Sequence, residues 1–221
     1  MTQQIIVNSR AIDILAVLML ITTIILIGTS RLKTCIWVYA FRSFALTLVS
    51  GLIASFSGIH HIYITTAISL ALKVIVIPGF LFHIVRKINI KKGQESLINY
   101  TFSLLLACGI ILIAFYSTQN VIQFENTFMR HCLPIALSIT LLGFFVMIIR
   151  KQAIAQILGL ITMEDGMFFA ALSTSYGMPL IVELGLFFDI MVSVIIMGIY
   201  VYRIKESFNT LDTDFLKELK E

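Results

Sequence analysis

The sequence predicts an all-α, polytopic membrane protein with about seven transmembrane helices. Of its 221 residues, 59% are hydrophobic and 13% are charged, whereas a soluble domain has roughly 45–50% apolar and about 25% charged residues. The mean hydropathy is +0.99. The apolar runs are too long and continuous for the alternating strands of about 10 residues that build an outer-membrane barrel. Helices of about 20 residues fit these runs, because a helix satisfies its own backbone groups within lipid.

Seven apolar segments are long enough to cross a bilayer. Their approximate bounds are 11–30, 35–57, 61–85, 98–117, 132–149, 153–174 and 179–202. We interpret the first segment as a retained span and not a cleaved signal peptide, because its apolar part exceeds the 7–15 residues of a signal and is followed by Arg31 and Lys33. After residue 202 the chain turns polar, and we expect 206–221 to form a cytoplasmic tail.

Basic residues are distributed unevenly between the connections. One set of alternating connections holds 12 Lys and Arg residues, and the other set holds only Arg10 and Arg130. The positive-inside rule places the richer set in the cytoplasm, with the N-terminus outside and the C-terminus inside. The formal charge of +4 then reflects topology and does not indicate nucleic-acid binding. Since no segment is long enough for a soluble domain, we expect any redox or hydrolytic site on another chain.

Two acids lie near the middle of predicted spans. Glu164 is central in the sixth segment and Asp189 in the seventh, and a short turn at 175–179 joins the two segments into a hairpin. Both acids lie about 15 Å from that turn by helical rise, so they can share one depth. A carboxylate at that depth costs at least ~2.5–3.5 kcal/mol unless it is paired, hydrated or neutralised. Proton or ion handling is the favoured role, and a neutral carboxyl locked in a packing hydrogen bond is the alternative.

Other charged residues also fall within the spans. Lys73 is mid-span, five residues before Pro78, and either carries a proton or snorkels to an interface. Arg42 either pairs with an acid or anchors the second span. Asp165 points about 100° away from Glu164, so we expect it on another face, with a function or with contact to a neighbouring subunit. Glu183 lies about 6 Å inside the outer end of its span, either as a pore-mouth acid or as part of the path.

The remaining residue types give no sign of a metal or cofactor site. Four histidines are interpreted as residues near the ends of spans, and no two have the i,i+4 spacing of a helical metal site. The cysteines are interpreted as membrane-buried thiols, because no CxxC spacing occurs. These residues are His60, His61, His83, His131, Cys35, Cys108 and Cys132. Small residues at Gly159, Gly166 and Ala170 predict close packing against the seventh helix or a partner.

Several motifs in the last third of the chain are characteristic. They are Arg150-Lys151-Gln152 leading into Ile157-Leu158-Gly159-Leu160, Met163-Glu164-Asp165-Gly166, Pro179-Leu180-Ile181-Val182-Glu183-Leu184-Gly185 with Phe187-Phe188-Asp189, and Phe208-Asn209-Thr210-Leu211-Asp212-Thr213-Asp214. With these motifs the chain resembles the membrane subunit called hydrogenase-4 component E. Through that family it is similar to the small K-type subunit of respiratory complex I and the C-type subunit of multisubunit cation/proton antiporters. The resemblance to component E extends over all seven spans.

The resemblance implies a three-helix K-like unit at 131–205, preceded by four further helices in 1–130. In the K-type subunit, two membrane carboxylates on successive helices belong to the proton pathway. Asp189 matches the later carboxylate in position, with Asp in place of Glu. Glu164 falls about three residues after the position suggested by the match at Gly159 and Leu160.

Our leading hypothesis is a non-catalytic subunit of a hydrogenase-like redox complex in a bacterial or archaeal cytoplasmic membrane. Glu164, Asp189, Lys73 and Glu183 would form a proton path, with Arg42 and Asp165 as charge partners, and this chain would hold no metal or cofactor. Antiporter-like and hydrogenase-like or complex I-like membrane subunits would be the partners. The alternatives are a subunit of a cation/proton antiporter assembly without redox chemistry, and a structural scaffold whose acids are static.

Overall fold

The computed structural model describes residues 2–57, 60–88, 98–122 and 132–175, together with the single positions 191 and 195. The elements in chain order are α1 (Thr2–Gly28), α2 (Leu32–Ser57), α3 (His60–Ser69), the π-helix η1 (Leu70–Val76), α4 (Ile77–Ile88), α5 (Tyr100–Ile122), α6 (Cys132–Ile149) and α7 (Ala153–Ser175). No strand occurs in the described ranges. The all-α fold class is confirmed.

Six stretches of the described residues are long and apolar enough to cross a membrane. They are Arg10–Gly28, Leu32–Ser55, Thr66–His83, Tyr100–Gln119, Cys132–Ile149 and Ile154–Thr174. These stretches agree with the first six predicted segments, and they confirm a polytopic membrane protein. The seventh segment, 179–202, lies outside the described residues, so the count of seven and the N-out orientation stay predictions.

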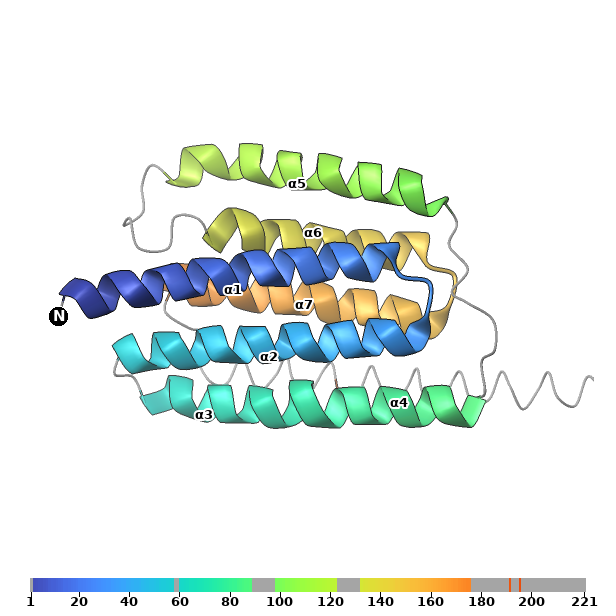
Figure 1. The fold of residues 1–221 in the computed structure, drawn as a ribbon, viewed down its shortest axis with the longest axis horizontal. Helices are drawn as coiled ribbons and strands as arrows, with labels where there is room; N and C mark the ends of the chain where they lie inside the picture. Colours follow the sequence, from blue (N-terminus) through green and yellow to red (C-terminus); the bar gives the residue numbers. More distant parts are fainter. Residues whose placement is uncertain are drawn as a thin grey trace, which may run out of the picture.

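The helices run side by side as one bundle (Figure 1). α1, α2, α6 and α7 form its centre, while α5 lies along one edge and the line of α3, η1 and α4 lies along the opposite edge. α7 is the most enclosed of the candidate spans, because 72% of its membrane window is buried inside the protein. Side chains of α7 are therefore placed to meet several other helices.

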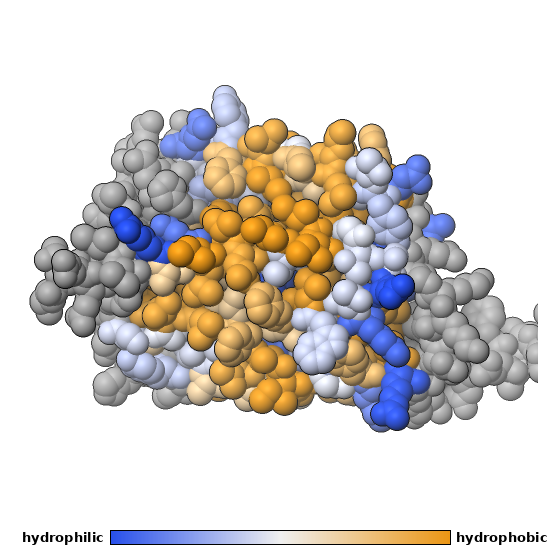
Figure 2. Space-filling model, in the orientation of Figure 1, coloured by the Kyte–Doolittle hydropathy of each residue, from blue (hydrophilic) through white to orange (hydrophobic). Residues whose placement is uncertain are grey.

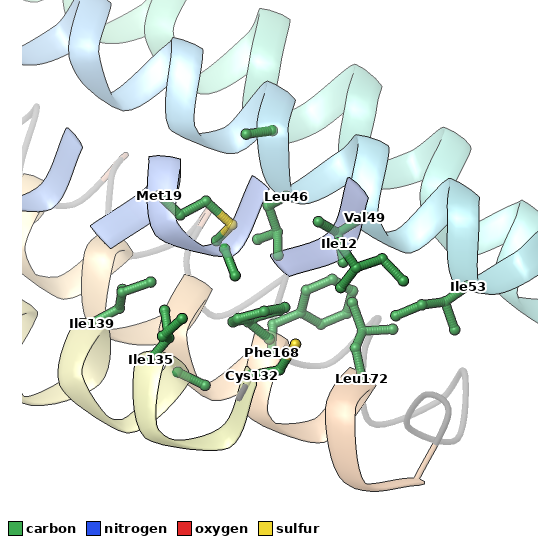
Figure 3. Close-up of a cluster of buried hydrophobic side chains, with 14 of the residues drawn as sticks. Ile12, Met19, Leu46, Val49, Ile53, Cys132, Ile135, Ile139, Phe168 and Leu172 are labelled. Atoms are coloured by element: carbon green, nitrogen blue, oxygen red, sulfur yellow. The ribbon is translucent and has the colours of Figure 1, made fainter. Parts of the chain in front are cut away.

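The largest apolar cluster joins the four central helices (Figure 3). Ile12 and Met19 of α1 and Leu46 of α2 contribute to it on one side, and Ile139 of α6 and Phe168 of α7 on the other. In lipid there is little hydrophobic drive for helices to associate, so van der Waals packing of such side chains holds the bundle together. Figure 2 shows one outer face of the bundle, where an apolar band lies between more hydrophilic ends.

Glycines let α6 and α7 approach to backbone contact. A Cβ added at Gly143 would lie 2.7 Å from the Cα of Met163, and one at Gly159 would lie 2.9 Å from the carbonyl oxygen of Gly143. A Cβ at Gly166 would clash with Thr140 in the same way. We expected Gly159 and Gly166 to face the seventh predicted span, 179–202, or a partner. This was wrong, because both glycines pack against α6. Close packing itself was correctly predicted by these small residues.

The third predicted span is one line of helix with a widened turn inside it. The amide of Ile77 donates to the carbonyl of Leu72, five residues back, which is the π-helical pattern. Pro78 follows directly, and a proline ring collides with the carbonyl four residues earlier in a regular α-helix and offers no amide hydrogen. A widened turn accommodates both features. It places Lys73 in the middle of the π-helical segment.

Arg150 lies at the end of the bundle where α6 stops. Its Nη2 donates to the carbonyls of Ile27 and Thr29 at 2.7 and 2.9 Å, and its guanidinium lies 5.5 Å from the centre of the Tyr100 ring. The sequence placed Arg150 among the loop charges, but the side chain is only 1% exposed. It occupies the C-terminal end of α1, where the last carbonyls have no intrahelical donor. Arg150 therefore fastens three helix ends together.

Candidate functional site: a buried cluster of four charges

Two acids side by side on α7 form the centre of the site. Glu164 is 4% exposed and Asp165 is fully buried. Glu164 is ten residues from each end of the stretch Ile154–Thr174, which corresponds to about 15 Å of helix on either side. Consecutive residues of a helix point about 100° apart, so each acid reaches a different part of the surrounding bundle. Both need a partner at this depth.

Lys73 is the partner that the two acids share. Its Nζ lies 2.7 and 2.6 Å from Oε1 and Oε2 of Glu164, and 2.9 Å from Oδ1 of Asp165. The ammonium group also lies 5.2 Å from the centre of the Phe168 ring, within cation–π range. The side chain is 1% exposed, so Lys73 does not snorkel to an interface. It is held by two carboxylates at once.

Arg42 of α2 holds the other side of Asp165. Its Nη2 donates to Oδ2 of Asp165 at 2.9 Å, and its Nη1 donates to Oγ1 of Thr162 at the same distance. The hydroxyl of Ser43 also points to Oδ2 of Asp165, at 3.4 Å. Asp165 thus bridges Arg42 and Lys73 through its two oxygens. Helices α2, η1 and α7 meet at this carboxylate.

The cluster is neutral in total when all four groups are ionised, with two cations against two anions. Burial of such groups is costly, and the attraction between them offsets this cost only when the geometry is good and the remaining donors and acceptors are satisfied. A buried ion pair is for this reason weak evidence for a gain in stability. Removing one member, however, leaves an uncompensated charge and typically costs about 3–5 kcal/mol.

The structure brings four of the six predicted site residues together. Glu164 and Lys73 are in contact, as expected from the cost of leaving either alone in the membrane. Arg42 pairs with an acid, which decides between its two alternatives. Asp165 points away from Glu164 as expected and contacts Arg42, but the two acids also share Lys73, which was not expected. Asp189 and Glu183 lie outside the described residues.

Sequence reasoning missed the hydroxyl groups around the charges. Thr162 precedes Asp165 by three residues and so lies on nearly the same helix face, while Ser43 follows Arg42 directly. Thr162 could have been identified by asking which polar residues of α7 lie on the same face as Asp165 and at the membrane depth of Arg42. Within the described residues, no group of three or more His, Cys, Asp or Glu side chains is placed to hold a metal ion.

The chain is similar to two kinds of known protein. It is 26% identical to hydrogenase-4 component E of Escherichia coli strain K12 over 213 residues, which cover 96% of this chain and 99% of that protein. It is 33% identical to an uncharacterized protein of Mycobacterium tuberculosis over 153 residues, which cover 69% of this chain and 70% of that protein. No family model matches the chain, and no solved structure gives a significant match.

Proposed function

The chain belongs to the hydrogenase-4 component E family, and on this basis we propose that it is an integral membrane subunit of a hydrogenase-like or related redox complex. We further propose that its buried charge cluster is part of a proton path through the membrane arm of that complex. Electron transfer and metal chemistry belong to other chains. The cytoplasmic membrane of a bacterium or archaeon is the proposed location.

The observation that carries the proposal is the shared lysine between Glu164 and Asp165. In the fully ionised cluster Lys73 contacts both carboxylates. A proton added to Glu164 would neutralise that carboxylate and weaken its attraction for the ammonium group. Lys73 would then be held mainly by Asp165, which Arg42 and Ser43 keep in place. A proton on Glu164 is therefore coupled to the position of a charge.

Asp189 and Glu183 are proposed to continue this path. The resemblance to K-type subunits pairs a carboxylate on the last span with one on the span before it, and both Glu164 and Asp189 fit that description. Within the cluster, the two cations Arg42 and Lys73 are balanced by Glu164 and Asp165, so these four residues hold no surplus positive charge. We therefore propose that Asp189 is a separate proton-binding site on the path, and that it is hydrated or protonated during part of the transport cycle.

A substitution that removes the titratable group and keeps its shape tests the proposal. We expect Glu164→Gln to reduce proton translocation strongly, because an amide cannot take up and release a proton in the physiological range. Proton uptake and electron turnover would be measured in membrane vesicles that contain the assembled complex at matched abundance. Asp13→Asn is the control, because Asp13 is an acid of the α1 span that lies outside the cluster.

A static packing role is favoured by one observation, namely that both carboxylates of the cluster are paired. If Glu164→Gln moves protons at the normal ratio to electrons, the cluster is a structural element and the proton-path proposal is wrong. Asp189→Asn and Asp189→Glu give a second measurement. We expect the glutamate variant to retain more activity, because it keeps a titratable carboxyl group.

A further inference from the structure

A row of buried hydroxyl groups follows α2 away from the charge cluster. It begins at Ser43, whose Oγ lies 3.4 Å from Asp165, and continues with Thr47 and Ser50, which are also buried. The spacing of four and then three residues places these side chains on one face of the helix. By helical rise, Ser43 to Ser50 spans about 10 Å along the bundle.

A second row of hydroxyl groups lies on α3, opposite the first. Ser50 and Thr66 share a hydrogen bond of 2.7 Å between their hydroxyl oxygens. A Cβ added at Gly51 would lie 3.7 Å from a methyl group of Thr66, so the two helices are close at this point. Ser69 follows Thr66 by three residues and precedes Lys73 by four. We call the residues Ser43, Thr47, Ser50, Thr66 and Ser69 the hydroxyl seam.

Ser69 indicates that the seam is hydrated. Its Oγ is buried and has no hydrogen-bond partner within the described residues, and the residue as a whole is 1% exposed. Leaving a buried hydroxyl unsatisfied carries the full desolvation penalty of that group. Buried waters typically bind such groups when other polar atoms are near enough to share them. Along the same line of helix, Thr66 lies about one turn before Ser69 and Lys73 about one turn after it, so both supply polar atoms near this hydroxyl.

The opposite side of the cluster is apolar. There, α2, α4 and α7 pack against one another and against the end of α1 mainly through hydrocarbon side chains, although the buried hydroxyl of Tyr39 belongs to this set. The buried residues of this apolar plug are Leu26, Leu32, Cys35, Ile36, Tyr39, Ile77, Leu81, Val85, Ile154, Ala155, Ile157, Leu158 and Ile161. Past Thr162 and the hydroxyl of Tyr39, which lie at the cluster itself, a proton at Asp165 or Lys73 meets mainly hydrocarbon toward this end, whereas several hydroxyls follow one another toward the α2–α3 end of the bundle.

We propose that the hydroxyl seam is a hydrated branch of the proton path that connects the charge cluster with the α2–α3 end of the bundle. The charge asymmetry of the connections predicts that this end faces outside. The inference rests on the proposed function, because a branch needs a path to join. The proposed function moves protons within the plane of the membrane. The hydroxyl seam would add a route by which the cluster exchanges protons with one side of the membrane.

Hydroxyl groups suit such a branch because each can accept a proton on its oxygen while donating its own. A transfer along the seam leaves each oxygen with one proton and reverses the direction of its hydrogen bond, so each hydroxyl must turn before the next transfer, and one proton and no electrons are moved. Either atom of the Ser50 and Thr66 pair can be the donor, so this hydrogen bond can run in both directions. Ser43 donates to Asp165, and Thr47 donates to the backbone carbonyl of Ser43. In the proposed branch, water bridges the remaining hydroxyls of the seam and Lys73.

Thr47→Val tests the seam with little change of shape, because valine replaces the hydroxyl by a methyl group. Thr118→Val on α5 is the matched control. Thr47 and Thr118 are 4% and 5% exposed, and each hydroxyl donates to the carbonyl four residues back. We expect Thr47→Val to lower the number of protons moved per electron pair several-fold in vesicles with the assembled complex, and Thr118→Val to leave it unchanged. The proposal would be overturned if Thr47→Val and Thr118→Val moved the same number of protons per electron pair.

Ser69→Ala tests the seam at a second residue by the same ratio of protons moved per electron pair. Ser138→Ala is its control, since Ser138 is a buried serine of α6 outside the seam.

Cryo-electron microscopy of the intact complex would locate water directly, and we expect an ordered water within hydrogen-bond distance of Ser69 Oγ. A dry seam there would overturn the inference even if Glu164→Gln abolished transport. Hydrated hydroxyls with normal transport in Glu164→Gln would instead count against the proposed function.

Discussion

The protein buries cations in two places, and the partners differ. At mid-membrane, Lys73 and Arg42 are held by the carboxylates of Glu164 and Asp165. At the end of the bundle, Arg150 is held by backbone carbonyls of α1 and lies over the ring of Tyr100. All three cations are buried to a similar degree. The depth of burial alone therefore does not distinguish a functional charge from a structural one.

The identity of the partner makes the distinction. A carboxylate can change its charge by binding a proton, and its attraction for a neighbouring cation changes with it. A backbone carbonyl has no such second state in the physiological range, and a guanidinium stays protonated. Arg150 can therefore only fix the helix ends, whereas the cluster around Lys73 can respond to a proton.

The largest expected effect comes from removing the shared cation. Lys73→Met should leave two acids with only Arg42 as partner and destabilise the fold by about 3–5 kcal/mol. Complex abundance and the thermal unfolding midpoint of the purified complex would show this loss. The double variant Lys73→Met with Glu164→Gln should recover much of the stability, because Asp165 still has Arg42. No recovery would mean that Lys73 acts through packing and not through its charge.

A smaller effect is expected at the other buried cation. Arg150→Ala leaves the carbonyls of Ile27 and Thr29 without their donor, which costs about 1–3 kcal/mol in unfolding free energy for a buried acceptor. The number of protons moved per electron pair should stay unchanged at matched complex abundance. A change in that ratio would break the distinction between the two regions, because it would give Arg150 a part in transport.

The smallest expected effect concerns a hydroxyl inside the cluster. Thr162→Val removes the closer of the two hydroxyl acceptors of Arg42 Nη1 and leaves Thr23 at 3.5 Å, while keeping nearly the same shape, and we expect a loss of about 1 kcal/mol in unfolding free energy. Thermal unfolding beside Thr118→Val would measure it. If the two variants are equally stable, Asp165 alone positions Arg42.

How much could be predicted from sequence differs between these regions. The apolar segments and the pairing of Glu164 with Lys73 could be predicted, because a lone charge in lipid is costly and the spacing along each helix fixes its depth. Arg150 was counted as a loop charge, since composition does not reveal which helix end an arginine will meet. The helical rotation between Glu164 and Asp165 predicts different faces, but it does not reveal that one long lysine side chain can contact both acids.

The π-helical turn could be predicted only in part. Pro78 indicated a disturbance in the third span, but a proline is compatible with a kink, a bend or a widened turn. Which of these forms depends on the neighbours, and here Lys73 must reach α7. The orientation of Gly159 and Gly166 had the same limit, because a stripe of small residues predicts close approach without naming the helix that approaches.

The glycine contacts between α6 and α7 decide which part of the cluster can move. Gly143, Gly159 and Gly166 bring the two backbones into direct contact, and interiors packed this tightly transmit strain and do not deform smoothly. The acids on α7 thus share a rigid body with α6. Lys73 reaches these acids from η1 on a flexible four-carbon side chain, so its ammonium group can shift without movement of α7. If the site handles protons as proposed, protonation of Glu164 would let one ammonium group move closer to Asp165, with no helix sliding past another.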